Sequence, residues 1–336
     1  MYNLRETAQK FKTEQNLHVF EDEDLSSRTS FKIGGKAKLL VEVEKVQDII
    51  FVIQTAIENT VPYVVLGGGT NVLFSDSGFD GIVIALNRFR GISLQADDKT
   101  NSAVITCLAG TVMNSVVNYC TEESFTALEP FAGLPGTVGG AAYMNARCFD
   151  KEISNVVGKI SYLEISERAS VTTYDAPTSR AFDACDARAF LIQEKTIDYD
   201  SALWDYKKSP FTGTNRIITK VEFNVHKGNK SEIESECAKI VKQRVDKGHF
   251  KFPCAGSVFK NDRAFGKPSG VIIDEAGLKG LQIGGAEVAP WHGNIIINTN
   301  NASAKDVMEL VEKIKTVVKE KTGFELETEI IFFGKY

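Results

Sequence analysis

The stretch Tyr63-Val64-Val65-Leu66-Gly67-Gly68-Gly69-Thr70-Asn71 joins a short apolar strand directly to a run of three glycines. An apolar strand over residues 38–43 and apolar side chains at helical spacing over 46–57 precede it, so the local order is strand, helix, strand, glycine loop. Glycine loses the most backbone entropy on folding, so consecutive glycines need a reason, such as close approach of the backbone to a ligand. Successive backbone N–H groups in such a turn form a concavity that suits an anion.

This glycine loop matches neither of the common nucleotide motifs. No Gly-Lys-Ser/Thr follows, as a P-loop requires, and Val72 occupies a position where a dinucleotide fingerprint would need glycine. Taken alone, the loop fits a tight turn and a phosphate site equally well.

A second glycine-rich stretch lies at residues 133–140, with Pro135, Gly136, Thr137, Gly139 and Gly140. Proline stiffens the entry to this loop, and the glycines leave its backbone accessible. Two such loops in one chain predict that they lie on two sides of one diphosphate ligand.

The rest of the chain alternates short strands with amphipathic helices. We expect strands over 81–86, 103–109, 158–165 and 217–225, and a helix over 112–122. A composition shift at 227–229 precedes Ser231-Glu232-Ile233-Glu234, a predicted capping box. The helix that it opens should bury Ile233, Cys237, Ile240, Val241 and Val245, and a last helix should begin near Ser303 and stop at Gly323.

Length and composition restrict the class of protein. The chain has 336 residues, which suggests two or three domains. A net charge of -5 without a clustered basic stretch argues against nucleic acid as the main partner. No apolar run is long enough to cross a membrane, and residues 1–20 lack the apolar core of a secretory signal, so we expect a cytoplasmic protein. Six scattered cysteines and four histidines predict reduced thiols and no metal site.

The motifs become specific when they are read in order. After 67–74 and 133–140 come Tyr143-Met144-Asn145-Ala146, Tyr206-Lys207-Lys208-Ser209, Cys254-Ala255-Gly256-Ser257-Val258-Phe259-Lys260-Asn261, Gly277-Leu278-Lys279-Gly280 and Leu326-Glu327-Thr328-Glu329. From about residue 30 to 334 the chain resembles the UDP-N-acetylenolpyruvoylglucosamine reductase (MurB) family. The short passage from 225 to 244 resembles the smaller subtype of that family.

The resemblance implies an α+β fold with a two-lobed FAD-binding module of the vanillyl-alcohol-oxidase (PCMH) type and a separate α+β substrate-binding domain. We expect lobe 1 over 1–86, lobe 2 over 87–227, the substrate domain over 228–322, and a C-terminal strand over 323–336 that returns to the active site. It also implies non-covalent FAD, NADPH as hydride donor, and a UDP-sugar substrate, with no obligate protein partner. The implied reaction reduces an enolpyruvyl sugar nucleotide in cell-wall precursor synthesis.

The resemblance also carries over the catalytic residues. Ser257 matches the proton donor of the family, and Glu329 matches its C-terminal catalytic glutamate, with Glu327 as the alternative if the register differs by two residues. Lys207 stands where the family usually has arginine, and lysine supplies charge without the planar fork that binds a carboxylate. Arg147 is therefore an alternative source of the guanidinium, and a surface arginine is an equally good interpretation of it.

The remaining family positions concern binding. The resemblance places Gly67, Gly68, Gly69, Thr70, Asn71, Pro135, Gly136, Thr137, Gly139, Gly140, Asn145 and Gly256 at the cofactor. It places Tyr206, Arg244, Lys247, Asn261 and His292 at the substrate. Two other functions stay open: an FAD oxidoreductase of the same fold that oxidises an alcohol or hydroxy acid, and a binding protein whose catalysis has decayed.

Overall fold

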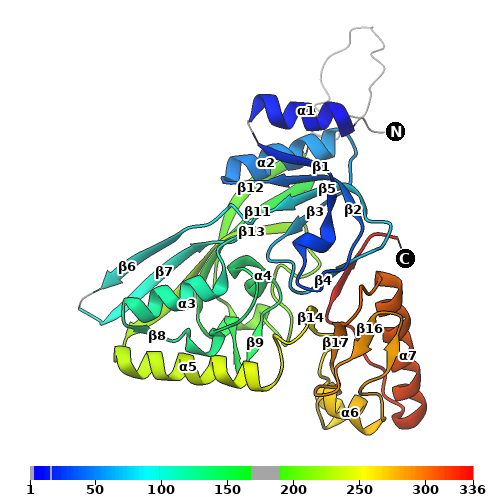
Figure 1. Cartoon of the computed structure of the whole chain (residues 1–336). Coiled ribbons are helices and arrows are strands. Elements are labelled where there is room, and N and C mark those ends of the chain that lie inside the picture. The colour runs from blue at the N-terminus through cyan, green and yellow to red at the C-terminus, as the bar shows by residue number, and fades with distance from the viewer. Residues whose placement is uncertain (1–3, 16, 98, 168–189, 336) are drawn as a thin grey trace, which may run out of the picture.

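The glycine loop follows strand β3 in a four-stranded sheet of order β1-β2-β5-β3 (Figure 1). The computed structural model describes residues 4–15, 17–97, 99–167 and 190–335. Strand β1 is antiparallel to β2, whereas β2, β5 and β3 run parallel. The elements of this lobe are α1 (Leu4–Glu14), β1 (His18–Asp24), β2 (Lys36–Glu42), α2 (Val46–Glu58), β3 (Tyr63–Leu66), β4 (Val72–Phe74) and β5 (Phe79–Ala85).

The second lobe is built on an antiparallel sheet of order β12-β11-β13-β7-β6, and β8 adds to β13. Helices α3 and α5 lie side by side against this lobe, far from helix α7 (Figure 1). Its strands are β6 (Ile92–Asp97), β7 (Ser102–Leu108), β8 (Phe125–Thr126), β9 (Arg147–Cys148), β10 (Lys151–Glu152), β11 (Val157–Glu167), β12 (Phe190–Asp198) and β13 (Arg216–Lys227). Its helices are α3 (Met113–Glu122), α4 (Val138–Tyr143) and α5 (Lys230–Asp246).

One hydrophobic core joins the two lobes. Ile49 of α2 and Ile84 of β5 belong to the same buried cluster as Ile105 of β7 and Phe223 of β13. The apolar patterns that predicted these strands and helices are thereby confirmed, because the residues at their expected spacing are the ones that the core buries.

The C-terminal part is built around a second hydrophobic core, to which lobe 1 also contributes side chains. Its antiparallel sheet has the order β14-β17-β16-β15, and its helices are α6 and α7. Phe31, Ile33 and Leu73 from lobe 1 lie in the buried cluster of this part. The bounds are β14 (Cys254–Ser257), α6 (Ser269–Glu275), β15 (Gln282–Ile283), β16 (Ala286–Val288), β17 (Ile295–Asn298) and α7 (Ala304–Thr322).

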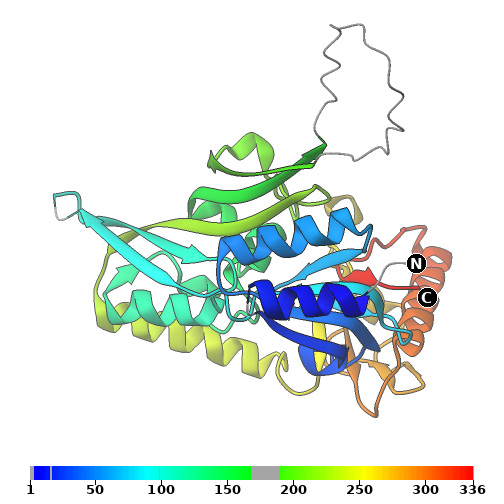
Figure 2. The same cartoon turned by 90° about the horizontal axis from the view of Figure 1, so that it is seen from above.

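The end of the chain returns to lobe 1, which Figure 2 shows from above. Strand β18 (Ile331–Phe333) pairs in parallel with β4, directly after the glycine loop. Ser303 caps α7 and Gly323 ends it in the left-handed conformation, as the sequence predicts.

The prediction for the start of α5 was wrong by two residues. Asn229, not Ser231, is the N-cap, because its side chain accepts hydrogen bonds from the backbone N–H groups of Ser231 and Glu232. Val241 and Val245 are 37% and 54% exposed, so they do not belong to the buried face. Instead, Arg244 is buried together with Ile233 and Ile240.

Helix α5 packs against α3 and the short turn of helix at Glu129–Phe131, although its residues were expected in the substrate domain. The proposed boundary at residue 228 stays a prediction. Within the described ranges, no helix is long and apolar enough to cross a bilayer.

Candidate active site

The two glycine loops meet each other directly. A Cβ on Gly68 would lie 2.6 Å from the Cα of Gly136, and one on Gly67 would lie 2.5 Å from the Oγ1 of Thr137. A Cβ on Gly136 would in turn lie 2.8 Å from the Oγ1 of Thr70. Gly68 therefore meets the backbone of the other loop, whereas Gly67 and Gly136 meet threonine hydroxyls, so the two lobes approach too closely here for a side chain.

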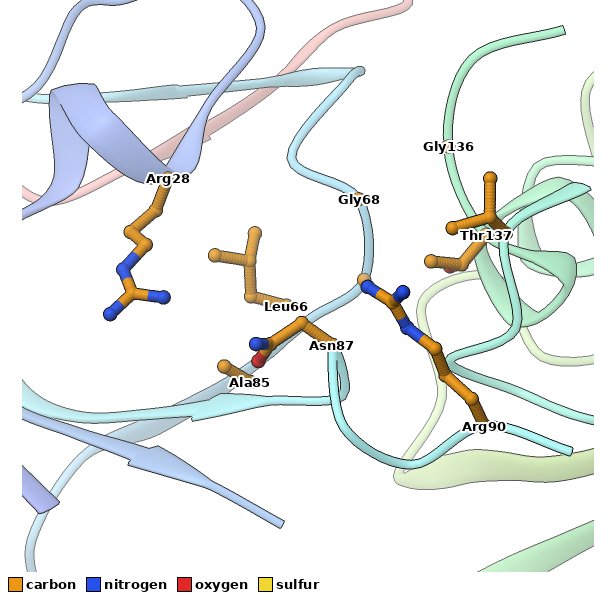
Figure 3. A pocket seen from close by; sticks show the side chains of 10 residues that line it. Arg28, Leu66, Gly68, Ala85, Asn87, Arg90, Gly136 and Thr137 are labelled. Carbon is orange, nitrogen blue, oxygen red and sulfur yellow. The ribbon is translucent and has the colours of Figure 1, made fainter. Parts of the chain in front are cut away.

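A pocket of about 280 Å³ opens beside this junction (Figure 3). Glycine-loop residues Gly67, Gly68, Gly136 and Thr137 line one part of it. The sequence analysis missed the other lining side chains, which are Arg28, Leu66, Ala85, Asn87, Arg90 and Val112.

Three predicted cofactor residues make close contacts within the protein. A Cβ on Gly139 would lie 2.7 Å from the Cβ of Ala109, so this glycine serves packing inside lobe 2. Asn145 is fully buried, donates to Glu152 and to the backbone of Asp205, and accepts from the Ser154 N–H. Gly69 packs on the backbone of Arg28, where its Cβ would lie 2.2 Å from the carbonyl oxygen. Pro135 and Gly140 are exposed and are not among the pocket-lining residues.

Lys207 and Glu329 form a buried ion pair. The Nζ of Lys207 lies 2.7 Å from the Oε1 of Glu329, and the two side chains are only 13% and 9% exposed. Lys207 adopts a φ of 56°, a left-handed conformation that is uncommon outside glycine and frequent at functional sites. The structure therefore brings together two of the three residues that the sequence analysis named as catalytic.

Burial and the lysine act in opposite directions on Glu329. Loss of water around the carboxylate raises its pKa, and the positive charge and hydrogen bond of Lys207 lower it. Burial is the larger effect, so the pKa of Glu329 lies above the ordinary value of a glutamate.

The third residue, Ser257, lies next to the point where the C-terminal tail crosses β14. The N–H of Glu329 donates to the carbonyl of Val258 at 2.7 Å. Within the described part of the chain, the Ser257 hydroxyl has no hydrogen-bond partner. Gly256 has a φ of +74°, and a Cβ there would meet nothing within 4 Å, so the face beside Ser257 is open.

Asn71 connects the glycine loop to this reacting end. Its Nδ2 donates to the carbonyl oxygen of Glu329 at 3.2 Å, and the Ile331 N–H donates to the Asn71 carbonyl. The loop 67–71 therefore runs from the pocket of Figure 3 to the Lys207–Glu329 pair.

The structure also gives the contacts of the two alternative residues from the sequence analysis, Glu327 and Arg147. Glu327 is 72% exposed at its side chain and pairs with Lys260, so it does not share the buried position of Glu329. The regular strand begins only at Ile331, which explains why the two glutamates do not face alike. Arg147 pairs with Asp150 and Glu152 and lies over the ring of Tyr206, so its guanidinium is already engaged.

A basic cluster lies at the end of α5. The Arg244 guanidinium and the Lys247 ammonium lie 5.3 Å and 5.1 Å from the ring centroid of Phe149. Arg244 donates to the carbonyl of Ala132, while its buried Nη2 has no partner among the described residues. Burial, helped by Arg244, lowers the pKa of nearby His249 to about 4. His292 is 6.2 Å from His249 between ring centroids, and burial lowers its pKa as well.

Tyr206 connects lobe 2 to the C-terminal part. Its hydroxyl oxygen accepts from the Nδ2 of Asn261 at 3.3 Å.

Of the residues that the structure describes, none form a group of three or more side chains suited to a metal ion. The described cysteines are all free, and Cys185 lies outside the described residues.

Fold and site together define a flavin-dependent oxidoreductase of the two-lobed FAD-binding class. The open glycine at 256, the close junction of the two loops and a buried acceptor on Asn87 that has no donor among the described residues fit a large cofactor of this kind. A family model described as "FAD binding domain" matches residues 37–165. A second model, the C-terminal domain of UDP-N-acetylenolpyruvoylglucosamine reductase, matches residues 247–333.

Comparison with known proteins identifies the family. The chain is 39% identical to the UDP-N-acetylenolpyruvoylglucosamine reductase of Treponema denticola, over 93% of this chain and 92% of that one. It is 37% identical to the reductase of Borreliella burgdorferi, with 94% of each chain covered. The crystal structure of the reductase from Thermus caldophilus is similar, with a TM-score of 0.67 at 29% identity, covering 95% of this chain and 99% of that one. The chain belongs to the UDP-N-acetylenolpyruvoylglucosamine reductase family.

Proposed function

We propose that the protein reduces UDP-N-acetylglucosamine enolpyruvate to UDP-N-acetylmuramate with NADPH and non-covalent FAD, a step in peptidoglycan precursor synthesis. The observation that carries this proposal is the buried Lys207–Glu329 pair, held beside Ser257 at the end of the glycine loop. A carboxylate substrate whose reduction needs both a cation and a proton donor suits such a site.

Gly67, Gly68, Gly136 and Thr137 would hold FAD, which would supply hydride transfer from NADPH to one carbon of the vinyl group. The chain has to supply the rest of the reaction. Lys207 stabilises the negative charge that develops toward the pyruvyl carboxylate. The Ser257 hydroxyl then gives its proton to the neighbouring carbon, which completes the addition of hydride and proton across the double bond. Glu329, whose pKa burial raises, orients Lys207 and can take part in returning that proton.

The substrate nucleotide is proposed to lie along the basic cluster of α5. The unpartnered Nη2 of Arg244 and the ammonium of Lys247 provide donors for a diphosphate. Tyr206 and Asn261 would bind the sugar of the substrate, and His292 is the remaining residue proposed to contact the substrate.

The domain division and the location of the protein are part of the same proposal. We keep lobe 1 at 1–86, lobe 2 from 87 and the tail at 323–336, and we favour ending lobe 2 near 247, because α5 packs on α3 and the C-terminal family model begins there. We also propose cytoplasmic residence, with no nucleic acid and no obligate protein as partner.

The test is a product analysis with purified protein. NADPH consumption should depend on the enolpyruvyl sugar nucleotide and should equal the UDP-N-acetylmuramate formed. Acid precipitation should release all the yellow flavin into solution, since its attachment is proposed to be non-covalent. Consumption of a hydroxy acid instead would favour an oxidase of the same fold, and the absence of any turnover would favour a binding protein.

A further inference from the structure

Ser30 connects the first glycine loop to the strand that carries Ser257. It lies between the short turn of helix at Leu25–Arg28 and β2. Its N–H donates to the carbonyl of Gly69 at 3.0 Å, and its Oγ donates to the carbonyl of Cys254 at 2.6 Å. The Gly69 oxygen lies 3.4 Å from the same Oγ, so the one hydroxyl hydrogen goes to Cys254, which is the nearer acceptor. Ser30 is thus bonded to the glycine loop through its backbone and to β14 through its side chain.

Strand β14 is irregular between Cys254 and Ser257. Cys254 lies opposite Ile297 of β17. Ser257, three residues later, lies opposite Ile295, which is only two residues from Ile297, so β14 holds one extra residue here. Such a β-bulge redirects the side chains around it, and Gly256 inside it has a φ of +74°. The direction of the Ser257 hydroxyl therefore depends on how the two ends of the bulge are held.

Hydrogen bonds to different parts of the molecule hold these two ends. After the bulge, the N–H of Val258 donates to the carbonyl of Asn294 at 2.9 Å. Before the bulge, the Cys254 carbonyl accepts from Ser30. The first bond fixes the bulge to the C-terminal part, and the second fixes it to the glycine loop of lobe 1.

The segment around Ser30 has other contacts that keep it in place. Phe31 and Ile33 are buried in the hydrophobic core of the C-terminal part. The Nδ2 of Asn298 also donates to the Phe31 carbonyl at 3.2 Å. Replacement of Ser30 by alanine therefore removes one side-chain hydrogen bond and leaves the apolar contacts of this segment intact.

We infer that Ser30 is a positioning residue for Ser257. Its hydroxyl holds the start of the bulge against the glycine loop, and so sets the position of the proton donor relative to a flavin bound on that loop. Asn71 makes the equivalent link from the loop to Glu329. A proton donor acts only within hydrogen-bond reach of its acceptor, and a displacement of about 1 Å costs up to roughly 100-fold in rate. The inference rests on the function proposed above, in which Ser257 gives its proton in the second half-reaction.

Stopped-flow measurement of the two half-reactions tests the inference. Ser30→Ala should slow reoxidation of the reduced flavin by the enolpyruvyl substrate about tenfold, and should leave flavin reduction by NADPH within about twofold of the unaltered enzyme. Ser30→Thr keeps the hydroxyl and should restore most of the rate. Ser27→Ala is the matched control, because the Ser27 hydroxyl donates to the carbonyl of Asp24 in its own turn. Equal losses in both half-reactions would make Ser30 a structural residue and overturn the inference.

A double variant separates the positioning of Ser257 from any other effect of Ser30. In the Ser257→Ala background, Ser30→Ala should cause no further loss, because the group that Ser30 positions is already absent. A further loss of about tenfold there would show that Ser30 acts independently of Ser257, and would overturn the inference.

The unaltered enzyme distinguishes failure of the inference from failure of the proposed function. If it reduces the enolpyruvyl substrate and Ser30→Ala does so equally fast, the inference is wrong and the proposed function stands. If the unaltered enzyme does not reduce this substrate, the proposed function is wrong and the inference falls with it.

Discussion

The glycine-loop junction and the Lys207–Glu329 pair lie at two ends of one site and are built differently. The junction consists of neighbouring loops of the two lobes, whose backbone and threonine side chains leave no room for a Cβ at Gly67, Gly68 and Gly136. The reacting end consists of side chains that come from lobe 2, from β14 and from the last residues of the chain. Changes at the first end should therefore weaken cofactor binding, and changes at the second should slow chemistry after the cofactor is bound.

The largest effect is expected at Ser257, in the second half-reaction only. Ser257→Ala should leave flavin reduction by NADPH nearly intact and slow reduction of the enolpyruvyl substrate by ~10²–10⁴-fold, the usual contribution of a general acid. Stopped-flow measurement separates the halves, with Ser115→Ala on the exposed side of α3 as the control. Equal losses in both halves would mean that Ser257 is structural and that the two ends are not separable.

The next effect concerns the cation. Lys207→Ala should slow the oxidative half-reaction by ~10²–10³-fold, because a preorganised charge at the developing carboxylate is lost. Lys207→Arg should retain much of the rate, and Arg147→Ala should cost clearly less, since Arg147 is paired with Asp150 and Glu152. Near-normal rates for both single alanine variants and for the double variant would show that neither cation acts on the substrate.

A smaller effect is expected at the junction. Gly68→Ala places a Cβ 2.6 Å from the Cα of Gly136, and such overpacking costs ~1–3 kcal/mol. FAD affinity should fall by roughly 10–100-fold, while the rates of enzyme saturated with FAD change little. Gly91→Ala is the control, because its Cβ would meet only the flexible end of Leu108, at 3.2 Å. A slow oxidative half-reaction in FAD-saturated Gly68→Ala would show that the junction also affects the chemistry, and would contradict the separation of the two ends.

The smallest effect is a shift in titration. Burial raises the pKa of Glu329 and Lys207 lowers it, so Lys207→Ala should raise the pKa further, whereas Lys207→Arg should not. The pKa of Glu329 is higher in the folded than in the unfolded protein. The free energy of unfolding should therefore decrease as the pH rises through the folded-state pKa and Glu329 ionises. NMR of carboxyl-labelled protein, with Glu329→Gln to assign the signal, measures the shift. An unchanged or lower pKa of Glu329 in Lys207→Ala would contradict the interaction between Lys207 and Glu329.

The same contrast explains what the sequence could reveal. Both glycine loops are continuous runs, and the apolar spacing of α2 and α7 is local, so these elements were predictable from short windows. Asn87 and Arg28 stand alone in the sequence and meet only through the parallel pairing of β2 with β5. The position of Asn87 just past the end of β5 was the one available signal, since ligands favour that edge of a parallel sheet.

The wrong prediction for the cap of α5 has an equally local cause. Asn229 competes successfully with Ser231 as a cap, and a motif search that looks only for Ser-x-x-Glu overlooks it. Gly139 packs against Ala109 and Asn145 bonds to Glu152, and contact of either residue with the cofactor stays a prediction.

The most direct test of the account is a single anaerobic turnover. Enzyme reduced by one equivalent of NADPH should be reoxidised when UDP-N-acetylglucosamine enolpyruvate is added, with the flavin absorbance restored and one equivalent of UDP-N-acetylmuramate formed. Flavin that stays reduced with this substrate and is reoxidised only when oxygen enters would contradict the proposal that Lys207, Glu329 and Ser257 form the site of enolpyruvyl reduction.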